Sequence, residues 1–252
     1  MTRKTPVLLF CTVLCLMSLA GTAQAKCEDE PRAGVNWTGC DKSGLDLKGV
    51  DLSGAVLRRV NFSRTNLSNA RLQRVDLNFS QLENTDFTGA RLEKARFNNA
   101  RIINSDFSTA FMDEARFSRT EIQQSVFTSA RINKVYFYEV QIKQSDFNKA
   151  QLRNADFSRA KLSGNNFQKV IAESAVFNNA DLENADFTGA NLKAAKFEEA
   201  NLINARFNQA DLSGASIRDA IIDGAIFEGA KLSSTIWVKY QRCRNGAVGV
   251  CK

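Results

Sequence analysis

Large apolar residues recur at every fifth position along most of the chain. The series runs from Leu47 to Trp237 without a change of phase, and only Ala172 interrupts it. A small residue precedes each of these central residues by two positions, except at Leu45 and Asn165. A helix repeats every 3.6 residues and a strand every two, so neither element alone produces this spacing. The chain must therefore fold as a repeat whose unit is five residues long.

Side-chain direction gives the shape of one unit. The small residue and the central residue are two positions apart, so on a strand they face the same side. The residue between them faces outward, and the sequence places mostly Asp, Asn, Arg, Gln or Lys there. The next two positions are polar or glycine, as in Ser53-Gly54, which is typical of a turn. Each unit is thus predicted to be a short strand and a corner, which together wind the chain around a closed core.

The identity of the central residues predicts how many sides each coil has. From Phe87 to Leu212 they alternate between phenylalanine and a non-aromatic residue. Only an even number of sides stacks phenylalanine on phenylalanine in successive coils, and two sides cannot enclose a core. Four sides, with 20 residues per coil, therefore fit best. We expect two phenylalanine columns that face each other across the interior, with aliphatic columns on the other two walls.

The repeat resembles that of a known family. Residues 180–184 read ADLEN and residues 190–194 read ANLKA, which is similar to the A-(D/N)-(L/F)-x-x motif of the pentapeptide repeat family. The resemblance extends over about residues 36–237. It implies an all-β fold, a right-handed quadrilateral parallel β-helix of about ten coils, on the order of 47 Å long. It implies no single function, because members of the family differ widely in role.

The first 25 residues have the features of a secretory signal peptide. Arg3 and Lys4 precede an apolar stretch over residues 6–20, and a small-x-small pattern ends at Ala25. A retained membrane anchor is the alternative, although the stretch is short for a membrane span. We predict a periplasmic or extracellular protein with no transmembrane segment after cleavage. Cleavage would lower the formal net charge from +7 to +5.

The predicted organisation has four parts. They are a signal peptide (residues 1–25), an N-terminal cap (26–36), the β-helix (37–237) and a C-terminal cap (238–252). Caps are expected because the open ends of a solenoid otherwise invite edge pairing. Trp37 and Trp237 share the phase of the central residues and lie near the two ends, so we interpret them as end plugs.

Four cysteines remain after the predicted cleavage, which favours disulfides in an exported chain. The Cα atoms of a disulfide must lie within about 7 Å of each other, and a rod of this length keeps its ends apart. This leaves the pairs Cys27–Cys40 and Cys243–Cys251, with free or metal-binding thiols as the alternative.

One irregularity falls on two adjacent sides. Asn165 occupies an inward small position, and Ala172 stands where Leu152 and Leu192 fill the neighbouring coils. We interpret this as a tolerated cavity in which Asn165 hydrogen-bonds to nearby backbone. A local bend or a ligand pocket is the alternative.

Outward residues 20 positions apart should stack in columns. One column is mostly Asp and Asn, from Asp46 to Asp186, and we interpret it as turn support rather than as an acidic binding surface. The next two columns combine arginine with aromatic residues, which is typical of binding patches. The alternative is a mixed, solvated surface. The candidate binding residues are Arg91, Arg96, Phe111, Arg116, Arg131, Tyr136 and Tyr138.

The sequence favours a non-catalytic protein. It contains no histidine, the commonest general base and metal ligand. The repeat has no insertion from which converging catalytic loops could be built. We therefore expect no cofactor, no metal site and no small-molecule substrate. The prediction is an exported structural or protein-interaction scaffold whose partner is a protein or an envelope component.

Three other functions are possible for a repeat of this kind. The basic and aromatic surface would suit an anionic polymer, either an envelope polysaccharide or nucleic acid. The family resemblance also includes DNA mimics that modulate topoisomerases, but those need an acidic surface and access to the cytoplasm. An exported enzyme that acts on polysaccharide would need a cleft with paired carboxylates, and the sequence predicts none.

Overall fold

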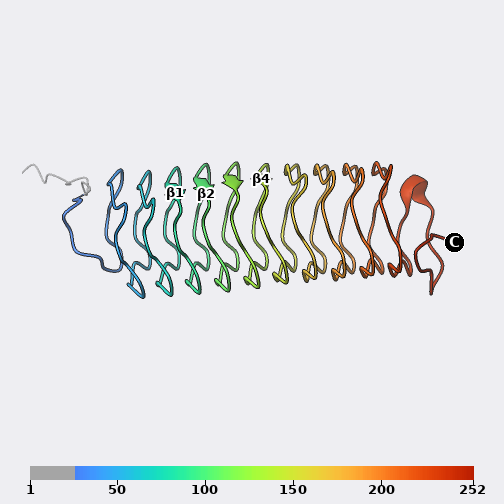
Figure 1. Ribbon diagram of the computed structural model, residues 1–252, viewed down its shortest axis with the longest axis horizontal. Helices are drawn as coiled ribbons and strands as arrows, with labels where there is room; N and C mark the ends of the chain where they lie inside the picture. Colours follow the sequence, from blue (N-terminus) through green and yellow to red (C-terminus); the bar gives the residue numbers. More distant parts are fainter. Residues whose placement is uncertain (1–25) are drawn as a thin grey trace, which may run out of the picture.

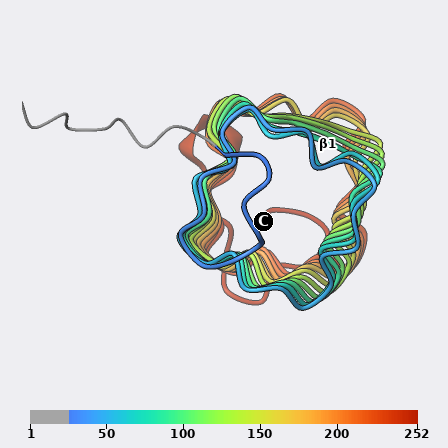
Figure 2. The same ribbon diagram turned by 90° about the vertical axis from the view of Figure 1, so that its left-hand side faces the viewer.

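The computed structural model describes residues 26–252, which form a rod of stacked coils (Figure 1). The predicted signal peptide lies outside these residues. Viewed along the rod, the coils superpose on a four-sided outline (Figure 2). Parallel bridges join each outward residue to the one 20 positions later, from Asn36–Val56 to Ser216–Ile236. The prediction of four sides and 20 residues per coil is confirmed.

Regular secondary structure is confined to short segments. Four strands form one parallel sheet in the order β1-β2-β3-β4, and each pairs with the next in 20-residue register. We call the side of the rod that holds them the strand face. The bounds are β1 Gln81–Glu83, β2 Arg101–Ile103, β3 Glu121–Gln123 and β4 Gln141–Lys143, followed near the C-terminus by the 3-10 helix η1 Val238–Tyr240.

The corners are β-turns that follow directly from the repeat. In the turn after Leu52, the Ala55 N–H donates to the Leu52 carbonyl at 3.0 Å. The third turn residue has a positive φ, which is 67° at Gly54 and 56° at Asn69. Glycine and asparagine adopt this conformation most readily, but Lys94 also holds it, with φ of 61°. Long side chains can therefore stand at the corners and project from the rod.

Phenylalanines fill the interior as predicted. Successive rings of one column stack at centroid distances such as 4.7 Å between Phe87 and Phe107. Rings of the two columns meet edge to face, as at 6.3 Å between Phe87 and Phe97. Both arrangements are favourable for aromatic pairs, and the central phenylalanines from Phe62 to Phe207 are fully buried. The two phenylalanine columns therefore run through the core from Phe87 to Phe227, and buried leucines fill most central positions of the N-terminal coils.

A ladder of small polar side chains runs inside the rod at the corner that follows the strand face. The backbone N–H of Ser105 donates to the hydroxyl of Ser125 at 3.2 Å, and the Ser125 N–H donates to Ser145 at the same distance. Asn165 ends this polar ladder, because its Oδ1 accepts the Ser145 N–H at 2.8 Å and its Nδ2 donates to the carbonyl of Ile142, also at 2.8 Å. The expectation that Asn165 bonds to nearby backbone is confirmed.

The N-terminal end is closed by residues that precede the first complete coil. Trp37 is fully buried, and its indole N–H donates to the Asp29 carbonyl at 3.1 Å. The Lys42 ammonium lies 4.0 Å from the centroid of the Trp37 ring and donates to the Cys27 carbonyl. The predicted disulfide between Cys27 and Cys40 is present and holds this segment against the first coil.

The C-terminal end is closed differently. The chain turns back through η1 and pairs antiparallel with the last coil at Lys231–Val248 and Ile236–Arg242. Trp237 lies 4.9 Å from the last ring of a phenylalanine column, Phe227, but unlike Trp37 it is only partly buried. The second predicted disulfide, Cys243–Cys251, is also present.

The N-terminal disulfide gives a prediction about local stability. Replacing Cys27 and Cys40 by serine should lower the stability of the N-terminal coils by about 3 kcal/mol, because the loop that the bond closes becomes free. Hydrogen exchange of the mature protein should then show lost protection around Trp37 and Phe62 and unchanged protection around Phe147, since each coil contacts only its neighbours. Uniform loss along the rod would contradict this local picture.

Candidate interaction face

The predicted binding residues fall on two adjoining sides of the rod. Bridges connect Arg91, Phe111 and Arg131 in one column, which we call the Arg91 face. A second set of bridges connects Arg96, Arg116 and Tyr136 in the next column, which we call the Arg96 face. Tyr138 lies in the turn that follows Tyr136.

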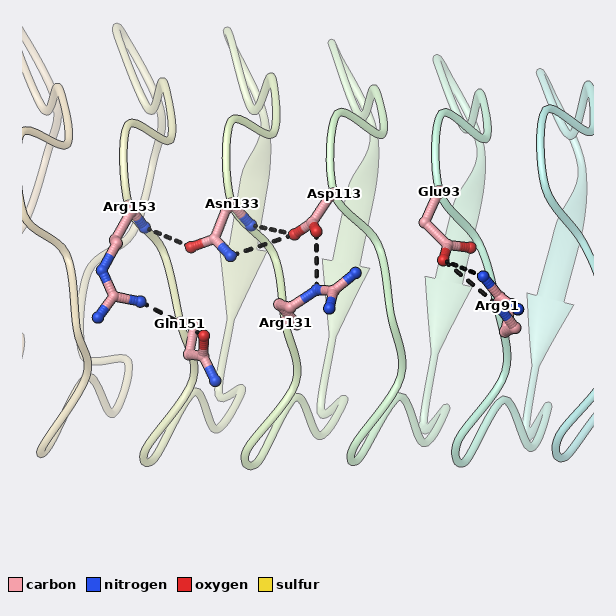
Figure 3. A network of polar contacts seen from close by, with 7 residues as sticks. All are labelled: Arg91, Glu93, Asp113, Arg131, Asn133, Gln151 and Arg153. Carbon is pink, nitrogen blue, oxygen red and sulfur yellow. Dashed lines mark hydrogen bonds and ion pairs between the residues drawn. The ribbon is translucent and has the colours of Figure 1, made fainter.

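Ion pairs neutralise much of the charge on the Arg91 face (Figure 3). Arg91 lies 3.1 Å from Glu93, and the Nε of Arg131 lies 2.7 Å from a carboxylate oxygen of Asp113. The Arg131 guanidinium also lies over the Phe111 ring, 5.0 Å from its centroid, and Phe111 is 38% exposed. These two arginines therefore already have partners within the chain.

Polar side chains at the neighbouring corner link successive coils (Figure 3). The Asn133 N–H donates to Asp113 at 3.1 Å, and the Arg153 N–H donates to Asn133 at 3.0 Å. Arg153 also contacts Gln151 through its guanidinium. This line of bonds fixes the corner side chains parallel to the rod axis.

The Arg96 face is less neutralised. Arg96 lies 3.0 Å from Asp76, a carboxylate that is nearly buried although it occupies an outward position. Arg116 lies over the Tyr136 ring at 5.5 Å and pairs with no carboxylate among residues 26–252. Tyr136 is 46% exposed, and the Tyr138 hydroxyl accepts a hydrogen bond from Arg159 at 3.3 Å. Exposed aromatic rings with arginines beside them are therefore present on this face.

Apart from Tyr138, corner residues are absent from the binding residues predicted from the sequence, because a turn position by itself indicates only a chain reversal. Phe79 occupies the third position of a turn, with φ of 62°, and is 44% exposed. The guanidiniums of Arg58 and Arg59 both lie 5.7 Å from its ring centroid. The sequence signal for this site is Phe79 itself, a bulky apolar residue at a turn position where polar residues or glycine are usual.

Shallow grooves follow the corner between the Arg91 face and the Arg96 face. One, of about 530 Å³, is lined by Lys94, Arg96, Glu114, Arg116, Lys134 and Tyr136. A second, of about 770 Å³, extends in the opposite direction along the rod and also has Lys94 in its wall. We call the two together the corner groove. Half of its lining residues are lysine or arginine, and three are acidic, namely Asp51, Glu93 and Glu114.

Comparison with known proteins identifies the repeat. The family profile described as "Pentapeptide repeat region" matches residues 33–107, 90–166 and 150–227, which together cover most of the chain. The chain belongs to the pentapeptide repeat family. No curated protein matches this pentapeptide repeat protein.

Two solved structures are similar to this chain. HetL of the cyanobacterium Nostoc sp. strain PCC 7120, a pentapeptide repeat protein involved in heterocyst differentiation regulation, matches with a TM-score of 0.72 and 24% identity. The match covers 84% of this chain and 93% of HetL. QnrB1, a plasmid-mediated fluoroquinolone resistance protein, matches with 17% identity and a TM-score of 0.33, over 67% of this chain and 91% of QnrB1. The likeness to HetL establishes the quadrilateral β-helix and carries no function across.

The acidic column of this pentapeptide repeat protein supports its turns. Asp86 accepts the N–H of Thr88 at 2.8 Å, and Asn166 accepts the N–H of Gln168 at 2.9 Å. The same bond to the residue two positions later recurs along the column at Asp46, Asn66, Asp106, Asp146 and Asp186. These carboxylates and amides are held by the backbone, which supports the structural interpretation of the column.

Asp186 makes stability depend on pH. Burial opposes its ionisation, but hydrogen bonds from Thr188, Gln168 and Arg206 outweigh burial and lower the pKa to about 2, from 3.8. A carboxyl with a lowered folded-state pKa stabilises the fold above its unfolded pKa and loses that effect as pH falls through the folded value. We expect the free energy of unfolding to fall by about 2 kcal/mol between about pH 4 and pH 2.

The pH effect can be measured by chemical denaturation across this range. Asp186→Asn keeps the bond to the Thr188 N–H but cannot ionise, so the variant should show a smaller decrease between pH 4 and pH 2 than the parent protein. An equal decrease in both would assign the effect to other carboxyls.

Two features of residues 26–252 bear on the site. No group of three or more cysteine, aspartate or glutamate side chains is placed to hold a metal ion. None of the helices in this region has the length and apolar character required to cross a membrane.

Proposed function

We propose that this pentapeptide repeat protein is an exported, non-catalytic scaffold that binds its partner through the Arg91 face and the Arg96 face. The observation that carries the proposal is the exposure of Phe111 and Tyr136 beside arginines on adjoining sides of a rigid rod. Arginine and large aromatic residues dominate the binding energy of protein interfaces. The partner that fits this surface is a protein or an envelope component with acidic and aromatic groups.

The setting and the scaffold support the proposal. The two disulfides at the ends of the rod indicate a non-cytoplasmic environment. Coil-to-coil bridges continue without interruption from Asn36 to Ile236, so no loop leaves the rod to build a catalytic cleft. The continuous core holds the outward residues in fixed columns, so the surface is preorganised for binding.

A site-specific photo-crosslinker tests the interaction face. The crosslinking residue replaces Tyr136 in one variant and Gln141, an exposed residue of β4 on the strand face, in the other. We expect one discrete crosslinked product from the Tyr136 position in intact cells and little from the Gln141 position. Equal products from both positions would show that the face has no preferred partner.

Export is tested separately by the N-terminus of the mature protein. Mass spectrometry of the protein from the extracytoplasmic fraction should give a chain that begins at Lys26. Recovery of the chain only from the cytoplasm, with its first 25 residues attached, would contradict export.

A further inference from the structure

Positively charged side chains cluster along the corner groove. Its turn residues Arg74, Lys94, Glu114 and Lys134 are spaced by 20, so they stack one above another along the rod. Beside them, Arg96 and Arg116 are directly bridged neighbours in successive coils. Like charges in directly opposite positions destabilise a sheet. Apart from Glu114, the fold thus places positive charges next to one another along the corner.

Carboxylates of the chain offset this repulsion only in part. Lys94 lies 3.5 Å from Glu114, and Arg96 lies 3.0 Å from Asp76. Arg74, Arg116 and Lys134 pair with no carboxylate within residues 26–252. The corner groove therefore has room for negative charge from outside the chain, and the exposed cations can reach it.

The shape of the groove fits an extended ligand. Its two parts share Lys94 and run from the coil of Gly54 to that of Lys134. Four coil-to-coil steps separate these residues, which amounts to about 19 Å along the rod. A single small anion would contact only one part of such a groove, whereas a polymer lying parallel to the axis would contact cations in successive coils.

The side chains favour carboxylate groups on a polysaccharide over nucleic acid. Guanidiniums bind carboxylates and phosphates alike through paired hydrogen bonds, so the choice between the two polymers depends on the aromatic rings and the compartment. Single-stranded nucleic acid is typically held by bases stacked on free aromatic faces, but arginines lie over the rings of both Tyr136 and Phe111. The end disulfides also indicate a compartment outside the cytoplasm.

We propose that the corner groove binds an extended polysaccharide rich in uronic acids, with the polymer parallel to the rod axis. This inference rests on the proposed function, since the Arg96 face forms one wall of the groove. It assigns roles to Lys94 and Lys134, which lie outside the set of residues predicted from the sequence.

Binding of the mature protein to polygalacturonate, measured by titration at low and physiological salt, tests the proposal. The groove variant is Lys94→Gln, Arg116→Gln, Lys134→Gln. The control variant, Lys143→Gln, Lys149→Gln, Lys161→Gln, removes the same charge from exposed residues away from the groove that make no ion pair in the described chain. We expect about tenfold weaker binding for the groove variant and less than about twofold for the control.

Three results would overturn the inference. One is an equal loss in both variants, which would reflect net charge alone. Another is the absence of polygalacturonate binding by the unaltered protein. The third is a groove-dependent loss for a single-stranded oligonucleotide without one for polygalacturonate. If a discrete product still forms at Tyr136 in cells, the proposed interaction face survives any of these results and only the polysaccharide assignment fails. Circular dichroism establishes that both variants remain folded.

Discussion

Phe147→Ala should lower the free energy of unfolding by about 3–5 kcal/mol, because it removes a fully buried ring and leaves a cavity. The ring stacks on Phe127 at 4.6 Å and on Phe167 at 5.0 Å, and it meets Phe137 edge to face. Coils above and below hold the cavity open, since their backbones are bonded to one another at fixed spacing. Denaturant unfolding of the mature protein measures the change.

The matched control for this substitution is Phe111→Ala. Phe111 is the same residue type in a nearby coil, but it is 38% exposed and faces outward. Removal of the Phe111 ring should lower the free energy of unfolding by less than about 1 kcal/mol, as for other surface substitutions. Similar losses at Phe147 and Phe111 would mean that the phenylalanine columns do not carry the stability of the rod.

Asn165→Ala should lower the free energy of unfolding by about 3–5 kcal/mol, although the substitution makes the repeat more regular. The side chain is 1% exposed, and it accepts the Ser145 N–H and donates to the carbonyls of Ile142 and Leu162. A buried polar group left without a partner costs about 1–3 kcal/mol. Thermal and denaturant unfolding, with hydrogen exchange at the Ser145 amide, measure the effect.

Ser125→Ala provides the comparison within the same polar ladder. It removes the acceptor of the Ser105 N–H and the hydroxyl that donates to the Gln123 carbonyl. That carbonyl keeps the Asn104 N–H, so the free energy of unfolding should fall by about 1–3 kcal/mol. Asn165→Ala is expected to be the more damaging of the two. The opposite order would show that Asn165 does not terminate the ladder in the way its hydrogen bonds indicate.

The proposed interaction face and the corner groove place different demands on the same rod. The face needs exposed aromatic rings, which Phe111 and Tyr136 provide. The groove needs cations that pair with no carboxylate of the described residues, which Arg116 and Lys134 provide. Variants that separate the two, such as Phe111→Ala against Lys134→Gln, can therefore assign a partner to one surface or the other, because Phe111 does not line the groove.

Part of the candidate site could be predicted from the sequence. The 20-residue register placed Arg91 beside Phe111 and Arg96 beside Arg116 before any coordinates, because position in a regular coil is fixed by number. Which cations are neutralised could not be predicted, since it depends on side-chain reach between coils. The Nε of Arg131 lies 2.7 Å from a carboxylate oxygen of Asp113, whereas the Arg116 guanidinium lies over the Tyr136 ring.

By itself, the sequence determined the architecture of this protein. A strict period of five gives every unit the same inward and outward positions, so the number of sides and the phenylalanine columns follow from the order of the residues. The length of the resulting rod then restricts which cysteines can pair at each end. Only the tertiary structure decided how Asn165 is satisfied, how the C-terminal segment folds back on the last coil and where the corner groove lies. The physical reason is that inward positions are constrained by packing in every coil. Corners and ends depend on contacts between particular side chains, either two or about 20 residues apart, and on the non-repeating caps.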